Sequence, residues 1–228
     1  MAGFGLLKRV VFASKDNKWS EYLYQELAHL DVDWHRVKNK KELELLELDS
    51  ISYIFFFHWS EIVPSNIHEK CKCIVVHTAN LPHGRGGSPI QNQIMDDIVQ
   101  SRINLLKMTD RVDSGPVYSS VPITLYGNLL DIWMTIANLT KKLIVEFIKK
   151  EPIPKNQETL STKPYKRRRN NSLPLQEDLY KIYKFIQMLD APGYPQAMLE
   201  LGKYNLYFSR AKLKDTKEII CDVKIEER

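Results

Sequence analysis

Two segments of this chain combine a side chain that can move a proton with a turn that can hold it in place. The apolar run 73–76 ends at His77, and a glycine-rich corner at 84–87 follows it. Further along, Asp113 opens an Asp-Ser-Gly-Pro turn. A histidine can donate to a developing oxyanion or protonate a leaving group. A carboxylate beside it stabilises the imidazolium and fixes the ring tautomer, so the two residues are candidates for acid–base catalysis.

The segments that must position these residues alternate between strand and helix patterns. Short apolar runs predict strands at 10–13, 32–37, 53–57, 74–77, 103–108 and 117–124. Helical spacing of apolar residues predicts helices over 19–30, 40–48, 89–100 and 129–149. Such alternation favours an α/β fold with a parallel sheet. Ligands of these sheets bind beyond the carboxyl ends of the strands, where we expect His77 and Asp113.

The character of the sequence changes after residue 150. We expect a crossing segment over 151–171, a helix over 178–189 and a β-hairpin of strands 197–201 and 204–209. The predicted domains are therefore a catalytic domain, 1–150, and a C-terminal extension, 151–228. Tyr204, Leu206 and Phe208 of the hairpin predict pairing with a second copy in a homodimer.

Composition bounds the remaining possibilities. The 228 residues are 43% hydrophobic and 27% charged, which suits a globular core without disulfide or metal staples. No apolar stretch approaches ~18 residues, so we expect no membrane partner. Three cysteines are an odd count that favours a reducing cytoplasm over a disulfide framework. No histidine spacing typical of a metal site occurs, and no metal is expected.

The net charge of +5 is concentrated in one run, 163–169. Three interpretations stay open for this run: a nucleic-acid partner, a phosphate-bearing small substrate and a solvated linker.

The motif around His77 resembles a known family. In order, the chain has His77, Leu81-Pro82, Arg85-Gly86, Pro89-Ile90-Gln91 and Asp113-Ser114-Gly115-Pro116. This order, over residues 7–150, resembles the formyltransferases that use 10-formyltetrahydrofolate, among them the methionyl-tRNA, glycinamide-ribonucleotide and nucleotide-sugar enzymes. Two later segments, Tyr165 to Arg168 and Leu189 to Pro195, resemble the nucleotide-sugar N-formyltransferases most. The resemblance implies a Rossmann-like formyltransferase domain with a mostly parallel sheet and a small C-terminal helix and hairpin.

The resemblance also implies roles for residues. His77 and Asp113 match the catalytic histidine and aspartate of the family in place and order. The family's asparagine stands two residues before the histidine, where this chain has Val75, which cannot donate a hydrogen bond. Asn80, in the following loop, is our candidate for the missing oxyanion donor.

The expected binding residues fall into two groups. The folate cosubstrate is expected to contact Ala79, Leu81, Pro82, Gly87, Thr109, Asp110, Arg111 and Val112. The amine substrate is expected to contact Ser14, His58, Trp59, Tyr165, Lys166 and Arg167. Ser14 follows the first strand, where a phosphate can sit, and Gly87 allows close approach of a backbone.

The resulting functional hypothesis is transfer of a formyl group from 10-formyltetrahydrofolate to the amine of an amino-sugar nucleotide. Alternatives are a formyltransferase for another amine, such as glycinamide ribonucleotide, and a non-catalytic binder of folate or sugar nucleotide, which Val75 motivates. Methionyl-tRNA is disfavoured as the amine, because the chain after Lys150 is short for the C-terminal domain of a methionyl-tRNA enzyme. A nucleic-acid binder that uses the basic run 163–169 is a further alternative, and a nucleic-acid partner is not expected.

Overall fold

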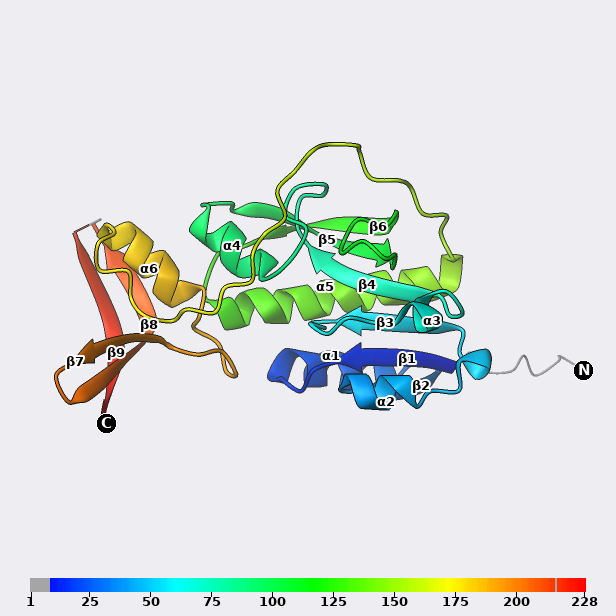
Figure 1. The fold of residues 1–228 in the computed structure, drawn as a ribbon, viewed down its shortest axis with the longest axis horizontal. Helices are drawn as coiled ribbons and strands as arrows, with labels where there is room; N and C mark the ends of the chain where they lie inside the picture. Colours follow the sequence, from blue (N-terminus) through cyan, green and yellow to red (C-terminus); the bar gives the residue numbers. More distant parts are fainter. Residues whose placement is uncertain (1–8, 216) are drawn as a thin grey trace, which may run out of the picture.

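A six-stranded sheet forms the centre of the molecule (Figure 1). The computed structural model describes residues 9–215 and 217–228, so expectations that reach into residues 1–8 lie outside the described part. The strands are β1 (Arg9–Ser14), β2 (Asp33–Val37), β3 (Tyr53–Phe57), β4 (Cys73–Thr78), β5 (Gln100–Lys107) and β6 (Val117–Thr124). Their order across the sheet is β2-β1-β3-β4-β5-β6. This confirms the expected α/β class with a mostly parallel sheet.

The sheet changes direction at β5. Strands β2, β1, β3 and β4 run parallel, whereas β4–β5 and β5–β6 are antiparallel. The helix before β5 is short and does not return the chain to the start of the sheet: α4 (Pro89–Met95) stops where Asp97 takes a φ of 58°. Gln100 therefore already lies in β5, and the expectation that the helix reaches residue 100 is wrong.

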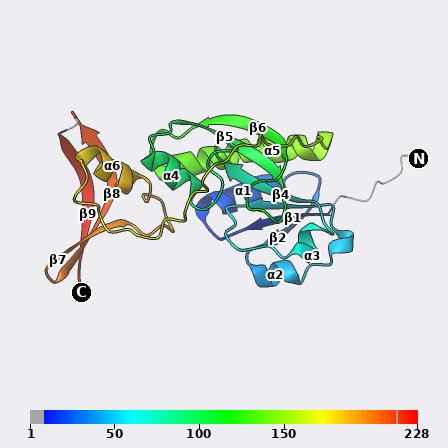
Figure 2. The same cartoon turned by 45° about the horizontal axis from the view of Figure 1, so that its top comes forward.

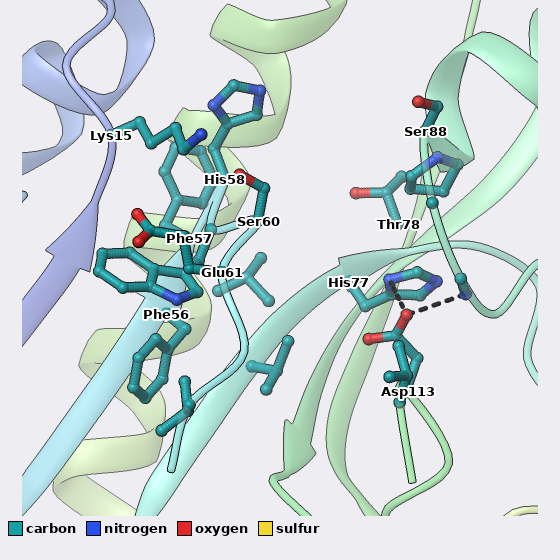
Figure 3. A pocket seen from close by; sticks show the side chains of 18 of the residues that line it. Lys15, Phe56, Phe57, His58, Ser60, Glu61, His77, Thr78, Ser88 and Asp113 are labelled. Carbon is teal, nitrogen blue, oxygen red and sulfur yellow. Dashed lines mark hydrogen bonds and ion pairs between the residues drawn. The ribbon is translucent and has the colours of Figure 1, made fainter. Parts of the chain in front are cut away.

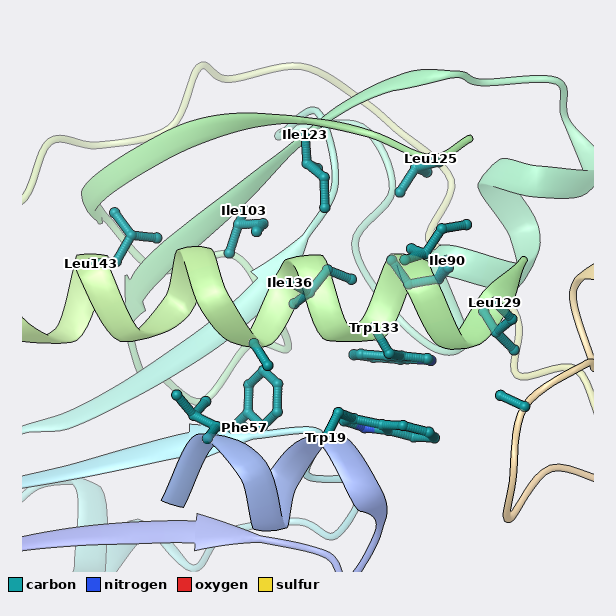
Figure 4. Close-up of a cluster of buried hydrophobic side chains, with 14 of the residues drawn as sticks. Trp19, Phe57, Ile90, Ile103, Ile123, Leu125, Leu129, Trp133, Ile136 and Leu143 are labelled. Carbon is teal, nitrogen blue, oxygen red and sulfur yellow. The ribbon is translucent and has the colours of Figure 1, made fainter. Parts of the chain in front are cut away.

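Helices cover both faces of the sheet. They are α1 (Lys18–Ala28), α2 (Lys40–Glu44), the 3₁₀ turn η1 (Leu48–Ser50), α3 (Ser65–His68) and α5 (Leu129–Lys150). On one face, α1 and α5 pack over the larger hydrophobic cluster, where Trp19 and Trp133 stack with ring centroids 5.3 Å apart (Figure 4). On the other face, Ile54 and Phe56 of β3 belong to a smaller cluster with Leu43 and Ile67.

The long helix α5 follows directly from its sequence. The Asn128 side chain caps its first turn by accepting from the Asp131 N–H. Ile132, Ile136 and Leu143 recur at helical spacing and are buried against the sheet. At the other end, Glu151 takes a φ of 43° and turns the chain back.

The segment after α5 crosses back along the molecule, as expected (Figures 1 and 2). Lys155 exchanges backbone hydrogen bonds with Val117 at the start of β6. Tyr165 does the same with the glycine corner: its N–H donates to Arg85, and its carbonyl accepts from Gly87. This strap across the sheet edge carries the chain to α6 (Leu179–Gln187).

The C-terminal part is a three-stranded antiparallel sheet rather than a hairpin. Strands β7 (Ala197–Leu201), β8 (Tyr204–Lys214) and β9 (Glu218–Glu227) pair in that order. Strand β8 therefore has a partner on each side, and β7 and β9 are the edges of this sheet. Pairing of this part with a second copy in a homodimer stays a prediction. Phe185 and Ala197 belong to the large cluster, so this part shares the main core.

Across the described residues 9–215 and 217–228, none of the helices has the length and apolar character needed to span a bilayer.

Candidate functional site

A cavity of about 990 Å³ opens at the edge of the sheet where β1, β3 and β4 end (Figure 3). Its walls come from the loops after these strands, the loop between β5 and β6, the first turn of α4 and the strap. His77 and Asp113 lie together in its wall, as the figure shows.

The His77 ring is held between two acceptors. Its Nε2 lies 2.9 Å from the Gly84 carbonyl oxygen, and its Nδ1 lies 3.4 Å from Asp113 Oδ2. The same Asp113 oxygen accepts a 3.0 Å hydrogen bond from the Gly86 N–H. The side chains of His77 and Asp113 are only 6% and 11% exposed. A proton on either ring nitrogen thus faces an oxygen that stabilises it, which suits proton transfer at a site with little water.

Asp113 reaches His77 by a route that the sequence does not reveal. Because β5 is antiparallel to β4, its end at Lys107 pairs with Ile74, near the start of β4. The loop 108–116 folds back toward the end of β4. Gly115 lies so close to the Lys107 carbonyl that a Cβ atom there would be 1.8 Å from the oxygen, so no larger residue fits.

A glutamine of the strap holds this loop. Gln157 Nε2 donates to the carbonyls of Asp113 and Gly115 at 2.9 and 2.8 Å. Its Oε1 accepts from the Arg85 guanidinium at 3.0 and 2.6 Å. Asp113 has a φ of 52°, a left-handed conformation that the clamped turn maintains. Sequence reasoning missed Gln157 because nothing in its local pattern shows which loop it will meet.

The glycine corner is shaped by the strap. A Cβ on Gly86 would lie 2.5 Å from the Tyr165 carbonyl oxygen, and one on Gly87 would lie 2.9 Å from Arg167 N. These glycines therefore permit close approach of the chain's own backbone, and through it the strap delivers Arg167 and Arg168 to the cavity.

One lobe of the cavity is apolar. We call the part lined by Phe56, Trp59, Val63, Val75 and Met108 the apolar lobe; apart from Val75, these side chains belong to or pack on the smaller cluster. Val75 and His77 alternate with residues of the larger cluster along β4, so both face this lobe.

The other lobe is aromatic and basic. We call the part lined by Lys15, Trp19, His58, Gln91, Trp133, Arg167 and Tyr194 the basic lobe. Its aromatic residues belong to or pack on the larger cluster, on the other face of the sheet. The His58 ring meets the edges of Trp19 and Trp133 at centroid distances of 5.4 and 4.7 Å.

His58 is uncharged at neutral pH. Burial, followed by the positive charges of Lys15 and Arg167, lowers its pKa from 6.5 to about 4. In the unfolded chain the His58 ring binds a proton once the pH falls below its ordinary pKa of 6.5. In the folded chain the ring binds a proton only when the pH falls to about 4. This contribution to stability is therefore lost as the pH falls through that window.

Lowering the pH from about 6.5 to about 5 should cost roughly 2 kcal/mol of unfolding free energy through His58, at about 1.4 kcal/mol per pH unit. Urea unfolding at the two pH values measures this loss. His58→Gln should lose about 2 kcal/mol less over the same interval, while the exposed control His83→Gln should behave like the wild type. Equal losses in the wild type and His58→Gln would contradict the assignment.

The structure brings many of the predicted residues to the cavity and leaves others outside. Those that line it are His58, Trp59, His77, Gly87, Thr109, Asp110, Arg111, Val112, Asp113 and Arg167. Those that do not are Ser14, Ala79, Asn80, Leu81, Pro82, Tyr165 and Lys166.

The expected oxyanion donor is wrong in this geometry. The Asn80 side chain donates to the Gln100 carbonyl at 2.8 Å, at the start of β5 and away from the cavity. Ala79 is fully buried behind β4, where its carbonyl accepts from Asn104 at 2.8 Å. The loop 79–82 thus anchors the end of β4, and its residues do not line the cavity.

The other residues outside the cavity have structural partners. Ser14 is fully buried in β1, and Lys15 lines the cavity in its place. The Tyr165 ring lies against Gly84, and burial, followed by Asp96, raises the pKa of its phenol to about 12. Lys166 contributes its backbone carbonyl, which accepts from Asn92 at 3.0 Å.

In the described part of the chain, no three histidine, cysteine or acidic side chains gather in a way that could hold a metal ion.

Comparisons with known proteins agree on one family. The model of the C-terminal domain of methionyl-tRNA formyltransferase matches residues 168–226. Methionyl-tRNA formyltransferase of Campylobacter lari is 29% identical over 157 residues, which cover 67% of this chain and 51% of that protein. The chain therefore spans about half the length of this curated relative.

Solved structures extend the match to nearly the whole chain. The structure of methionyl-tRNA formyltransferase from Clostridium thermocellum has a TM-score of 0.88 at 35% identity, covering 97% of this chain and all of that one. A sugar N-formyltransferase from Shewanella sp. FDAARGOS_354 has a TM-score of 0.64 at 15% identity, covering 89% of this chain and 96% of that chain, and shows likeness of fold. On the identity to a relative matched over its full length, the chain belongs to the formyltransferase family.

Proposed function

We propose that this chain transfers a formyl group from 10-formyltetrahydrofolate to a primary amine. The observation that carries the proposal is the buried pairing of His77 with Asp113 in the wall of the cavity. The apolar lobe fits the flat pterin of the folate, since Phe56, Trp59 and Met108 offer ring and thioether surfaces.

The chain's residues would share the proton movements of the transfer. The folate, when bound, supplies the formyl carbon; a C–N bond forms to the amine, and the C–N bond to the folate nitrogen breaks. Asp113 takes the proton that the attacking amine loses. His77 Nε2 would exchange its contact with the Gly84 carbonyl for the formyl oxygen, donate to that oxygen and pass a proton to the departing nitrogen. In the described residues neither Val75 nor Asn80 offers an amide to this oxygen, so His77 is the donor assigned here.

We propose an amino-sugar nucleotide as the amine substrate. The basic lobe combines aromatic surfaces with Lys15 and Arg167, which suits a ligand with a ring and phosphates. Arg167 and Arg168 of the basic run line the cavity, which favours a small phosphate-bearing ligand over an open nucleic-acid surface. The cavity has the size typical of small-molecule sites.

Methionyl-tRNA is a second candidate, favoured by the relative from Clostridium thermocellum. That protein carries the methionyl-tRNA name, and this chain covers all of it. A short C-terminal part is thus no argument against this substrate, contrary to the expectation from length. The family model matched at residues 168–226 also bears that name.

A mass-spectrometric screen tests both candidates. The protein is incubated with 10-formyltetrahydrofolate and, separately, with amino-sugar nucleotides, glycinamide ribonucleotide and methionyl-tRNA. We expect one amino-sugar nucleotide to gain a formyl group, with no gain when the His77→Asn variant is used. Formylation of methionyl-tRNA alone would select the second candidate. Retained folate binding without transfer to any amine would identify a non-catalytic binder.

A further inference from the structure

We propose that the basic lobe contains a subsite for an anionic oxygen group, a phosphate or carboxylate, built around the hydroxyl of Tyr194. The inference rests on the proposed function in one respect: the anionic group is taken to belong to the amine substrate. The subsite itself follows from three features of the lobe: a fixed hydrogen-bond direction, buried donors that converge on the Tyr194 oxygen, and cations outside any ion pair of the described residues.

A chain of hydrogen bonds fixes the direction of the Tyr194 hydroxyl. Asn17 Oδ1 accepts from the Ser20 N–H as the cap of α1, so its Nδ2 faces His58 Nδ1 at 3.1 Å. The amide nitrogen can only donate, and His58 Nδ1 must accept. The ring proton is then on Nε2, which donates to Tyr194 Oη at 3.2 Å. The Tyr194 proton is thereby left to point elsewhere, toward a further acceptor.

Two further buried donors converge on this hydroxyl oxygen. Gln91 is 4% exposed. Its Nε2 and the Trp133 Nε1 are both buried, and neither forms a well-aligned hydrogen bond with a described residue. Both lie near enough to the Tyr194 oxygen to oppose the rise in its pKa that burial causes. A buried donor that lacks a well-aligned acceptor is destabilising, and a bound anionic oxygen beside the Tyr194 hydroxyl would supply one.

The lobe also carries positive charge that no ion pair in the described residues holds, although Glu61 lines the same cavity (Figure 3). Lys15 and Arg167 line it, and neither forms an ion pair with a described residue. Both charges reach His58, since both lower the pKa of its ring. Asp16, next to Lys15 in sequence, is held by Arg36 at 3.1 Å and Lys38 at 3.0 Å.

These features select the chemical class of the ligand. Donors and cations together match anionic oxygens, which accept several hydrogen bonds at once. An apolar side chain or a second cation would leave the Gln91 and Tyr194 donors unsatisfied. A sugar nucleotide and the end of a nucleic acid both carry phosphate, so they share this chemistry, and the test separates them.

Quenching of tryptophan fluorescence provides a direct assay, because Trp19 and Trp133 stack beside the subsite. Inorganic phosphate and acetate are titrated into the full chain. We expect saturable binding of at least one of them, weakened about 10-fold or more by Tyr194→Phe and by Arg167→Gln. The matched controls are Tyr180→Phe on α6 and Arg169→Gln in the same basic run, neither of which lines the cavity. They should stay within about twofold of the wild type.

Tetrahydrofolate binding is measured in each variant as a check on folding and should be unchanged. Affinities for the bound anion that are equal in the wild type and the two subsite variants would overturn the proposal, and so would the absence of binding by both anions. Competition then identifies the source: uridine diphosphate should displace the anion more strongly than a cytidine-cytidine-adenosine trinucleotide if the phosphate belongs to a sugar nucleotide. The opposite order would assign it to a nucleic acid.

The two proposals can fail separately. Anion binding that persists while no amine is formylated would refute the proposed function and leave the subsite. If the protein transfers the formyl group while its affinity for both anions is unchanged by Tyr194→Phe and Arg167→Gln, the subsite alone is refuted.

Discussion

Replacing His77 with asparagine should lower the rate of formyl transfer by about 100- to 10,000-fold, the scale expected when an acid–base or oxyanion group is lost. Asparagine is shorter and cannot carry a transferable proton. It can still donate a hydrogen bond, so the variant would retain much of its rate if His77 acted only as a hydrogen-bond donor. Single-turnover formylation of the amine identified in the screen measures the effect.

The control for this variant is chosen from the same loop. His83 is exposed and does not line the cavity, so His83→Asn should keep the wild-type rate. Tetrahydrofolate affinity and the urea midpoint show whether the His77 variant remains folded after losing its bond to the Gly84 carbonyl. A folded His77→Asn protein with near-normal turnover would refute the assignment.

Asp113→Asn should lower the rate by a similar factor while leaving folate affinity largely intact. The amide oxygen of the variant can still accept from the Gly86 N–H, as the carboxylate does at 3.0 Å. Gln157 holds the turn through backbone carbonyls, which the substitution leaves in place. The lost function is therefore the negative charge that accepts a proton beside His77.

Separate measurements of rate and binding test this claim. Folate affinity is obtained by titration, and the rate by single turnover at saturating folate. The exposed control Asp49→Asn should leave both unchanged. Equal losses of affinity and rate in Asp113→Asn would instead give the carboxylate a structural role in the loop 108–116.

Local pattern was enough to predict most elements and the catalytic candidates. The strand 53–57 and the strand 117–124 were predicted with their observed bounds, because short apolar runs between polar breaks leave few alternatives. The helix 129–149 was predicted from apolar residues at helical spacing, among them Ile132 and Ile136, which the structure buries. His77 was predicted at the end of its strand, and the structure places it there beside Asp113.

Residues whose positions depend on distant parts of the chain could not be placed in this way. Asn80 was a plausible donor by its distance along the chain from His77, yet its amide bonds to Gln100 because β5 runs antiparallel beside β4. Strand direction is set by how neighbouring segments pair, and nothing within the 103–108 pattern encodes it. The third strand of the C-terminal sheet, β9, was missed because its charged residues hide a period of two.

The sequence by itself determined the family motif, the alternation of strands and helices, and the two residues able to move a proton. Only the tertiary structure decided how they are assembled. The strap brings Gln157 to the loop of Asp113 and Arg167 to the cavity, while α1 and the turn before β7 bring Asn17 and Tyr194 to His58. The physical reason is that hydrogen-bond direction, burial and the pKa of a ring depend on neighbours that come from distant parts of the chain, and these meet only when the core has packed.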